Sequence, residues 1–481
     1  MNRTCGSLLL LALSIALGSL PEPLRAEEPS PPEKTDLIGV YREAVLSNAN
    51  IAASRADYQA TREVVPQARA GLLPQINAGG SYTDTRYDVK QYGHTLNRNG
   101  MLFQASLNQA IIRADRWFQL RAAKAVDKQA ALQLAALEQN LIMQSAENYF
   151  AVLRAQDNLA ANKAEEAAFK RQYEQARERF DVGMSDRTDL LEAQAGYDTA
   201  RANRIVAERQ VQDAFQALTT LTNRDYHFVQ GIRHTLPVAP PTPVDAQSWV
   251  DIAVKSNLNL RASQYAVTSA EETLRQRKSG HAPTVDLVAR YERGNNDSLG
   301  YVNNPFTNRF INYSGTVSQS SIGVELNIPI STGGLTSSQV RESYQRLSQS
   351  EQQREGQRRQ VVQDTRNFHR AVNTDVEQVQ ARRQAIVSNQ SSVEATELGY
   401  QVGTRNIVDV LEAQRSLYSA VRSYNDARYD YILNQLRLKQ AAGVLSPEDL
   451  QDLSQYLKPD YDPDRDFVPP GVKLSDAKLD F

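Results

Sequence analysis

The chain has 481 residues and a formal net charge of −2, which gives no electrostatic reason to expect a nucleic acid as a partner. Hydrophobic residues make up 41% of the sequence and aromatic residues only 7%. Alanine, glutamine, arginine, leucine and glutamate dominate long stretches. This mix suits long helices packed through small side chains and argues against a thick globular core.

The amino terminus has the pattern of a secretory signal. Arg3 supplies the positive charge, residues 8–17 form a short apolar run, and Ala26 is the expected last residue before cleavage. A membrane anchor is the alternative, but a spanning helix needs about 20 apolar residues. We therefore expect residues 1–26 to be a cleaved signal peptide. Cys5, the only cysteine, leaves with it, so the mature chain is expected to have neither a disulfide nor a lipoprotein cysteine.

The first half of the mature chain alternates helical and strand-like patterns. Residues 36–70 are predicted to be helical. Residues 75–86 and 101–107 alternate apolar and polar side chains, as strands do, and the polar residues 84–100 predict a loop between them. Residues 114–180 contain neither proline nor glycine, and a single helix of that length would be on the order of 100 Å long. No compact domain buries such a helix, and its many alanines favour close coiled-coil packing.

The same order of elements occurs twice, which predicts an internal two-fold repeat. Eleven residues between Ala44 and Tyr82 recur at a constant distance further on, between Ala253 and Tyr291 (253 − 44 = 209). The prolines between 237 and 243 mark a linker. We therefore predict a first structural repeat over residues 27–235 and a second over residues 236–445.

Each repeat also contains a glycine break followed by an acidic helix start. Residues 180–194 (FDVGMSDRTDLLEAQ) and 400–414 (YQVGTRNIVDVLEAQ) match at a constant spacing, from Gly183 to Gly403 (403 − 183 = 220). The two glycines are predicted to turn the chain between antiparallel helices. The charges after the second break fall at i, i+4 and i+7, on one helix face: Arg405, Asp409 and Glu412.

The second repeat contains two clearer strand-like segments, residues 285–292 and 321–330. Apolar and polar side chains that alternate over about ten residues are typical of a transmembrane barrel, although a half-buried strand of a soluble sheet alternates in the same way. Four strands cannot close a barrel, and open sheet edges are not tolerated in lipid. Two or more copies of the chain must therefore share one barrel, and the alternation does not fix their number.

Catalytic and metal-binding motifs are absent from the sequence. The five histidines are scattered without i, i+4 spacing, and neither a Walker A motif nor G-x-G-x-x-G occurs. Thr332, Gly333 and Gly334 follow a strand but lack the P-loop lysine, and they predict a turn. We therefore expect no enzyme activity, no cofactor and no metal site.

Three stretches make the chain resemble the TolC family of outer-membrane efflux and secretion channels. They are residues 68–82 (ARAGLLPQINAGGSY), 179–194 and 400–438. The resemblance spans roughly residues 36–450, and without a lipoprotein cysteine the chain is more similar to the type I secretion branch. It implies a mainly α fold with a transmembrane β part. Three identical chains would share a 12-stranded β-barrel, four strands from each, above a coiled-coil α-barrel tunnel that closes at its tip.

The resemblance also assigns roles to residues at the tip. Arg405 is expected to bind toward Thr188 and Asp189, and Tyr400 to reach Asp189, so that these four residues form a latch. The constriction ring would consist of six carboxylates per trimer, from Asp409 and Glu412. Such a ring attracts cations and opposes anions, and repulsion within it raises the pKa of some of its carboxylates. Ordinary solvated helix charges are the alternative interpretation of these carboxylates.

The residues and the resemblance together predict the outer-membrane exit duct of a tripartite type I secretion or efflux system in a Gram-negative cell. Its expected partners are outer-membrane lipid, a periplasmic adaptor (membrane fusion) protein and an inner-membrane ABC or proton-driven transporter. The alternative is a periplasmic coiled-coil adaptor or scaffold that does not insert in the outer membrane, whereas a passive porin would need many more strands. Residues 446–481, rich in proline and aspartate, are expected to be a largely disordered periplasmic tail.

Overall fold

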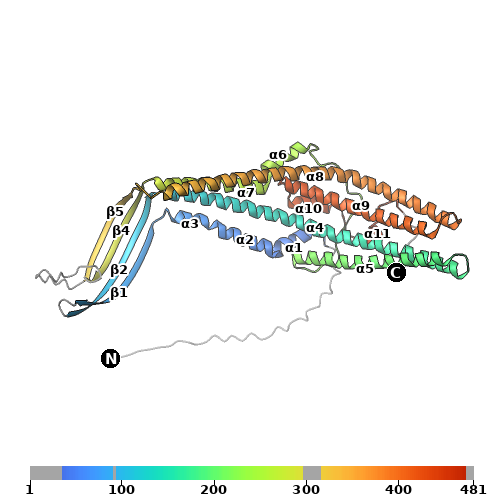
Figure 1. The fold of residues 1–481 in the computed structure, drawn as a ribbon, viewed down its shortest axis with the longest axis horizontal. Helices are drawn as coiled ribbons and strands as arrows, with labels where there is room; N and C mark the ends of the chain where they lie inside the picture. Colours follow the sequence, from blue (N-terminus) through green and yellow to red (C-terminus); the bar gives the residue numbers. More distant parts are fainter. Residues whose placement is uncertain (1–34, 90–93, 296–315, 473–481) are drawn as a thin grey trace, which may run out of the picture.

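The computed structural model describes residues 35–89, 94–295 and 316–472. The molecule is strongly elongated, with a β-sheet at one end and long helices that run side by side to a tip at the other end (Figure 1). The predicted signal peptide, residues 1–26, lies outside the described residues.

One order of elements occurs twice along the chain. The first set is α1 (Leu37–Ser47), α2 (Ala49–Arg62), α3 (Val64–Ala70), β1 (Gln75–Val89), β2 (His94–Ile112), α4 (Ala114–Asp181) and α5 (Arg187–Thr222). The second set is α6 (Ala246–Ser256), α7 (Leu258–Lys278), β4 (Thr284–Asn295), β5 (Thr316–Asn327), α8 (Leu335–Gln401) and α9 (Ile407–Ala441). The short strand β3 (Gly231–Ile232) lies between the two sets.

Corresponding side chains cap the corresponding helices of the two sets. Asn48 accepts a hydrogen bond from Ile51 N at the start of α2, and its amide donates to a carbonyl at the end of α5. Asn257 accepts from Leu260 N at the start of α7 and donates to Ala441 O at the end of α9, at 2.9 Å. Each asparagine thus satisfies a free helix amide and joins a short helix to the end of a long one.

Two very long helices form the body of the molecule. α4 has 68 residues and α8 has 67, so each is about 100 Å long at 1.5 Å per residue. Alanines fill much of the buried face of α4 and allow neighbouring helices to approach closely, as expected from the sequence. Larger side chains, among them Tyr149, Phe150 and Tyr429, fill the core halfway along the helices. In the described part of the chain, no helix is both long and apolar enough to cross a membrane.

The sheet contains four antiparallel strands in the order β1-β2-β4-β5. The strands of the first hairpin are longer than predicted: β1 extends to Val89 and β2 begins at His94. The prediction of a loop over residues 84–100 is therefore wrong for most of that segment. Polar side chains such as Asp84 and Asn99 hide the strand pattern, but backbone pairing continues between them regardless of side-chain polarity.

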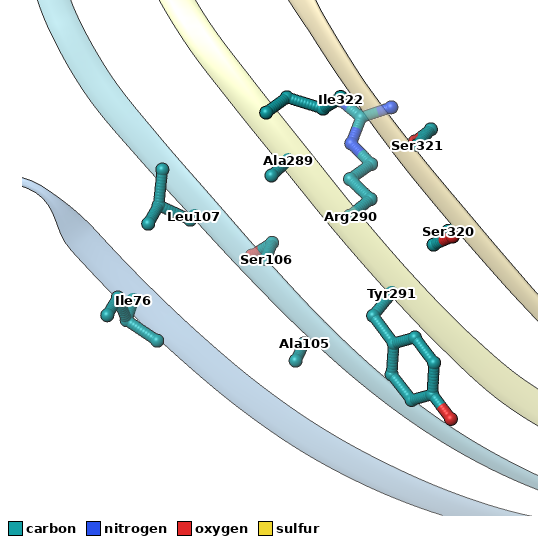
Figure 2. A pocket seen from close by; sticks show the side chains of 10 residues that line it. All are labelled: Ile76, Ala105, Ser106, Leu107, Ala289, Arg290, Tyr291, Ser320, Ser321 and Ile322. Atoms are coloured by element: carbon teal, nitrogen blue, oxygen red, sulfur yellow. The ribbon is translucent and has the colours of Figure 1, made fainter.

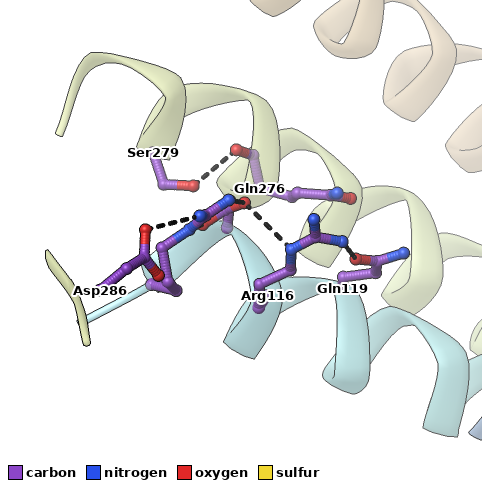
Figure 3. Close-up of polar contacts among 7 residues, drawn as sticks. Arg116, Gln119, Gln276, Ser279 and Asp286 are labelled. Atoms are coloured by element: carbon purple, nitrogen blue, oxygen red, sulfur yellow. Dashed lines mark hydrogen bonds and ion pairs between the residues drawn. The ribbon is translucent and has the colours of Figure 1, made fainter. Parts of the chain in front are cut away.

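Ion pairs fasten the sheet to the helices. Arg113, the residue before α4, places Nη1 3.1 Å from Asp286 Oδ2 on β4 and Nε 3.1 Å from Asp115 Oδ1. Figure 3 shows Asp286 beside the start of α4, where Arg116 also contacts Gln119. Because these charged side chains are only partly exposed, they fix the first turn of α4 against the second strand pair.

The carboxyl-terminal segment is folded, so the expectation of a largely disordered tail is wrong for residues 446–472. It forms α10 (Pro447–Ser454), β6 (Leu457–Lys458) and α11 (Pro463–Asp466), and β6 pairs with β3. Leu450 and Phe467 are buried in the main core. The prolines and aspartates that suggested disorder instead start helices, since Pro447 and Pro463 occupy first-turn positions.

Candidate functional site

Two similar turns form the tip at the end of the long helices. Gly183 has φ of 75° and Gly403 has φ of 80°, in the left-handed region that favours glycine. Each turn is followed by a capped helix: Asp189 N donates to Asp186 Oδ1 at 2.9 Å, and Asp409 N donates to Asn406 Oδ1 at 2.8 Å. The recurring sequence therefore folds into recurring geometry, with both glycines between antiparallel helices.

A compact apolar cluster holds the four helices together just behind the turns. Phe169 of α4, Ala193 of α5, Tyr400 of α8 and Leu411 of α9 are among its buried members. Gly196 leaves room for the Phe169 ring, because a Cβ at this glycine would lie 2.8 Å from the ring. The cluster thus makes the tip of one chain a single packed unit.

The four residues of the expected latch lie at the tip but do not bond to one another in the way the resemblance implies. In the described part of the chain, neither Arg405 nor Tyr400 is hydrogen-bonded to Thr188 or Asp189. Arg405 Nη1 instead lies 3.8 Å from Asp409 Oδ2. Asp189 Oδ2 accepts from Ser185 Oγ at 2.9 Å, and Thr188 is exposed in the first turn of α5. The structure of the single chain thus places the four residues at the tip in other contacts, and the latch stays a prediction.

Tyr400 has a partner that the sequence did not reveal. The guanidinium of Arg179, in the last turn of α4, lies 4.8 Å from the centre of the Tyr400 ring, and Tyr400 is only 9% exposed. This contact joins the ends of α4 and α8. The internal repeat gave no signal for it, because the position that matches Arg179 is Gly399.

The two expected ring carboxylates lie on the outer face of α9, away from its buried Ile407, Val410 and Leu411. Asp409 completes a capping box with Asn406. Glu412 Oε2 lies 2.8 Å from Arg415 Nη1. A single chain thus presents both carboxylates at the surface of the tip, each beside an arginine.

The sheet at the other end has one apolar face. The register places Ile76, Leu107, Ala289 and Ile322 in one row across all four strands, and Figure 2 shows this row. The neighbouring row on the opposite face is polar: Asn77, Ser106, Arg290 and Ser321. Ile76 is 72% exposed and Ile322 76% exposed, so the described part of the chain leaves much of the apolar face uncovered. The predicted alternation of strand side chains is therefore confirmed.

The described residues include no group of three or more histidine, cysteine, aspartate or glutamate side chains that could hold a metal ion. The chemistry available at the tip is that of fixed charges, hydrogen bonds and apolar contacts.

Comparison with known proteins agrees with this architecture. The family model described as "Outer membrane efflux protein" matches residues 40–224 and 249–444. The outer membrane protein TolC of Vibrio cholerae is 35% identical over 94% of this chain and 98% of its own length. TolC of Escherichia coli is 34% identical over 88% and 85%. The alkaline protease secretion protein AprF of Pseudomonas aeruginosa is 25% identical over 86% of each chain.

Solved structures show the same fold at low sequence identity. A structure of CusC has a TM-score of 0.74 and 17% identity, and the match covers 88% of this chain and 99% of that one. The outer membrane protein VceC of Vibrio cholerae has a TM-score of 0.72 and 16% identity over 85% of this chain and 96% of that one. The predicted fold, long helices with a four-strand β part, is thereby confirmed. The chain belongs to the outer membrane efflux protein family, as a TolC-like channel protein of the Gram-negative outer membrane.

Proposed function

We propose that the chain is the outer-membrane exit duct of a tripartite type I secretion or efflux system. In this proposal three copies assemble, and their twelve strands close into one barrel in the outer membrane. The long helices of the three copies continue as a tunnel across the periplasm. Proteins or small molecules would leave the cell through this tunnel.

The incomplete sheet is the observation that carries the proposal. Among the residues that the structure describes, the order β1-β2-β4-β5 leaves one side of β1 and one side of β5 without a neighbouring strand. Unpaired strand edges are costly in lipid, where no water satisfies their backbone groups. The exposed apolar face also needs an apolar environment. Edge-to-edge pairing of several copies satisfies the strand edges, and lipid around the closed barrel covers the apolar face.

The relatives support a role in a larger machine. Their names include an alkaline protease secretion protein and the outer membrane protein of a toluene efflux pump, so both proteins and small molecules are candidate cargo. The sequence contains no Walker A motif that could bind a nucleotide to drive transport. We propose that an inner-membrane ABC or proton-driven transporter supplies the energy and that a periplasmic adaptor protein joins it to the tip.

We further propose that the tip is a gate. Arg405 is exposed in the turn between α8 and α9, and we propose that it binds Thr188 or Asp189 of a neighbouring copy. Six carboxylates, Asp409 and Glu412 from each copy, would then surround the narrowest point. Within one copy, the contact of Arg179 with the Tyr400 ring joins the ends of α4 and α8. We propose that closure between copies uses Arg405 together with the Tyr400 hydroxyl, which would reach Asp189.

Membrane fractionation tests the proposal against its alternative, a periplasmic scaffold. We expect the full-length protein in the outer-membrane fraction as an oligomer of three copies that resists SDS until it is heated. Cross-linking in cells should capture the adaptor and the transporter with it. Release of the protein with the soluble periplasm, as a monomer, would instead support the scaffold.

A further inference from the structure

A small cavity lies where the segment between the two repeats passes over α8 and α9. This segment, residues 233–245, connects β3 to α6, and we call it the linker. The cavity has a volume of about 180 Å³, the space of roughly six water molecules. Pockets for drug-sized ligands have about 300–1,000 Å³, so this cavity suits only a small organic molecule.

Three elements supply the walls of the cavity. Residues 233–238 of the linker alternate between exposed and partly buried positions, and the partly buried ones line the cavity: His234, Leu236 and Val238. The α9 wall includes two residues one helical turn apart, on one helix face: Tyr424 and Arg428. The α8 wall includes another such pair: Val379 and Arg383. Apolar, aromatic and cationic side chains thus meet around one space.

Hydrogen bonds and ring contacts fix these walls in the single chain. Tyr431 Oη accepts from Ala239 N and donates to Ala239 O, both at 3.0 Å, which ties the linker to α9. His234 Nε2 donates to Asp466 O at 2.8 Å. The His234 ring is stacked with the Tyr424 ring, with their centres 6.0 Å apart. A ligand would therefore enter a formed cavity and would not have to order its walls.

One wall contains a buried guanidinium that binds only neutral oxygens. Arg428 is 4% exposed, and its Nη2 donates to Arg233 O at 3.0 Å. Among the described residues, no aspartate or glutamate forms an ion pair with Arg428. Asp157 is near enough for the Arg428 charge to affect it, but both of its oxygens accept hydrogen bonds from tyrosines. Because a buried charge is costly without a counter-ion, this site favours an anion.

A second cation lines the same cavity from the opposite helix. Arg383 of α8 is exposed and belongs to the lining. Burial lowers the pKa of His234, and the charges of Arg428 and Arg383 lower it further, so both guanidinium groups lie within electrostatic range of one ring. In the described part of the chain, no aspartate or glutamate belongs to the lining. The cavity therefore combines positive charge with apolar walls.

The matching positions of the first repeat contain ion pairs instead. α5 and α9 correspond at a spacing of 220 residues, so Arg428 matches Glu208 (428 − 208 = 220) and Tyr424 matches Arg204 (424 − 204 = 220). Arg204 forms ion pairs with Glu208 and with Glu166. The arginine of the first repeat thus has two carboxylate partners within the chain. The same helix packing therefore does not by itself require an arginine without a carboxylate.

We propose that this cavity is a binding site for a small organic carboxylate with an aromatic or branched apolar body. The carboxylate group binds Arg428 and Arg383, because a planar guanidinium matches a carboxylate with two parallel hydrogen bonds. The apolar body packs against Tyr424, Leu236 and Val379. All of these residues belong to one chain, so the site does not depend on the duct proposed above.

Binding of 3-phenylpropionate to the purified full-length protein tests the site. This probe joins a carboxylate to one aromatic ring and is small enough for the cavity. Saturation-transfer difference NMR measures its affinity, and we expect a dissociation constant below about 1 mM for a ligand of this size. The matched ligand control is 3-phenylpropionamide, which has the same shape without the charge and should bind about tenfold more weakly or worse.

Two single substitutions separate the charge of the site from its space. Arg383→Gln removes one cation from an exposed position and should weaken binding of 3-phenylpropionate about tenfold. Arg382→Gln is the matched control, because Arg382 is the next residue of α8 and is exposed but does not line the cavity. It should bind as the native protein does. Val238→Trp fills the cavity from the linker, keeps both arginines and should abolish binding.

Arg428→Gln should also abolish binding, but Arg428 is buried and its loss can impair folding. Arg383→Gln and Val238→Trp therefore decide the test if Arg428→Gln does not assemble. Equal affinity for the probe in the native protein, Arg383→Gln and Val238→Trp would overturn the proposal. Equal affinity of the native protein for the carboxylate and the amide would overturn it too, as would the absence of binding at about 10 mM probe.

Discussion

The Arg405 guanidinium lies beside the Asp409 carboxylate one helical turn away, with Nη1 3.8 Å from Oδ2. In the single chain the Arg405 side chain is 62% exposed and the Asp409 side chain 39% exposed. An exposed pair of this length contributes between zero and about 1 kcal/mol, so Arg405 can leave Asp409 for partners on a neighbouring copy at little cost. Arg405 is therefore involved in both roles proposed for the tip: it pairs with the ring residue Asp409 in the single chain, and it is the arginine of the proposed latch.

The ring makes a prediction about ion preference. Asp409→Asn with Glu412→Gln removes six carboxylates from an assembly of three copies, and we expect its preference for cations over anions to fall, because fixed charges at a constriction select ions of opposite sign. The reversal potential in a salt gradient across a planar bilayer measures this preference. Glu448→Gln with Asp452→Asn removes as many charges from α10, far from the tip, and should leave it unchanged. Equal reversal potentials in all three proteins would rule out the ring.

Replacement of glycine by alanine should have opposite effects on stability at two positions of the second repeat, one in the tip turn and one inside α8. Gly403→Ala should destabilise the tip by about 1–2 kcal/mol, because its φ of 80° is unfavourable for alanine although space is available. Gly356 lies inside α8, also with open space, and Gly356→Ala should stabilise the helix by up to about 1 kcal/mol. Hydrogen exchange of the two segments measures both. Similar effects at the two positions would contradict the assigned turn.

Because one face of the sheet is apolar, we expect a charged side chain to be tolerated on the opposite, polar face but not on the apolar face. Ile322→Lys puts an ammonium group on the face that includes Ile76 and Leu107, and in lipid we expect a cost of up to about 2–4 kcal/mol. Gln319→Lys is the matched control on the opposite face, where it pairs with Glu292. The amount of heat-sensitive oligomer in outer-membrane fractions measures the effect. The assignment of faces fails if Gln319→Lys lowers this amount as much as Ile322→Lys.

Asp157 predicts a dependence of stability on pH. Burial raises the pKa of this carboxyl from 3.8 to about 6, although hydrogen bonds from Tyr461 and Tyr429 and the nearby Arg428 charge oppose the rise. The folded protein therefore binds the proton more readily than the unfolded chain, and this stability is gained as pH falls below about 6. Relative to Asp157→Asn, the native free energy of unfolding should increase by about 2 kcal/mol between pH 7.5 and 4.5. Urea unfolding at the two pH values measures it.

His234 provides the control of opposite sign. Burial, together with the charges of Arg428 and Arg383, lowers the pKa of this imidazole to about 4, against the hydrogen bond to Asp466 O. The contribution of neutral His234 to the free energy of unfolding is therefore fully present above pH 6.5 and is lost as pH falls toward 4. As pH falls from 7.5 to 4.5, the native free energy of unfolding should decrease relative to that of His234→Gln. Over the same pH range it should increase relative to that of Asp157→Asn. If the free energies of unfolding of both variants changed with pH in parallel with that of the native protein, neither group would titrate as the structure implies.

The long helices and the sheet faces could be predicted because their signals are local. Absence of proline and glycine over residues 114–180 gave a helix that the structure extends by one residue, to Asp181. Apolar alternation gave the correct face for Ile76, Leu107 and Ile322. Likewise, Gly183 and Gly403 were singled out by their recurrence, and both have the positive φ of a turn.

The features that were missed depend on contacts between distant segments. The carboxyl-terminal segment, residues 446–472, has the composition of a disordered tail. Only the three-dimensional packing shows that Leu450, Tyr461 and Phe467 are buried against the helices. In the sequence, Asp157 does not differ from other helical carboxylates. Its hydrogen bonds with Tyr429 and Tyr461 become apparent only in the structure. Residues 84–89 and 94–100 are too polar to suggest strands, although their backbones pair. The latch of Arg405 with Thr188 and Asp189 stays a prediction, since in the single chain Arg405 lies beside Asp409 instead.

Single-channel conductance of the purified full-length protein in planar bilayers tests the central claim, a duct closed at its tip, most directly. Arg405→Ser with Tyr400→Phe removes the proposed latch groups and keeps an aromatic ring under Arg179. Arg346→Ser is the matched control, because Arg346 also pairs with a carboxylate one turn away on an exposed helix. We expect a small native conductance, the same in Arg346→Ser, and a several-fold larger conductance in the double variant. A double variant that conducts no more than the native protein would contradict the closed tip, and a protein that forms no pore would contradict the duct itself.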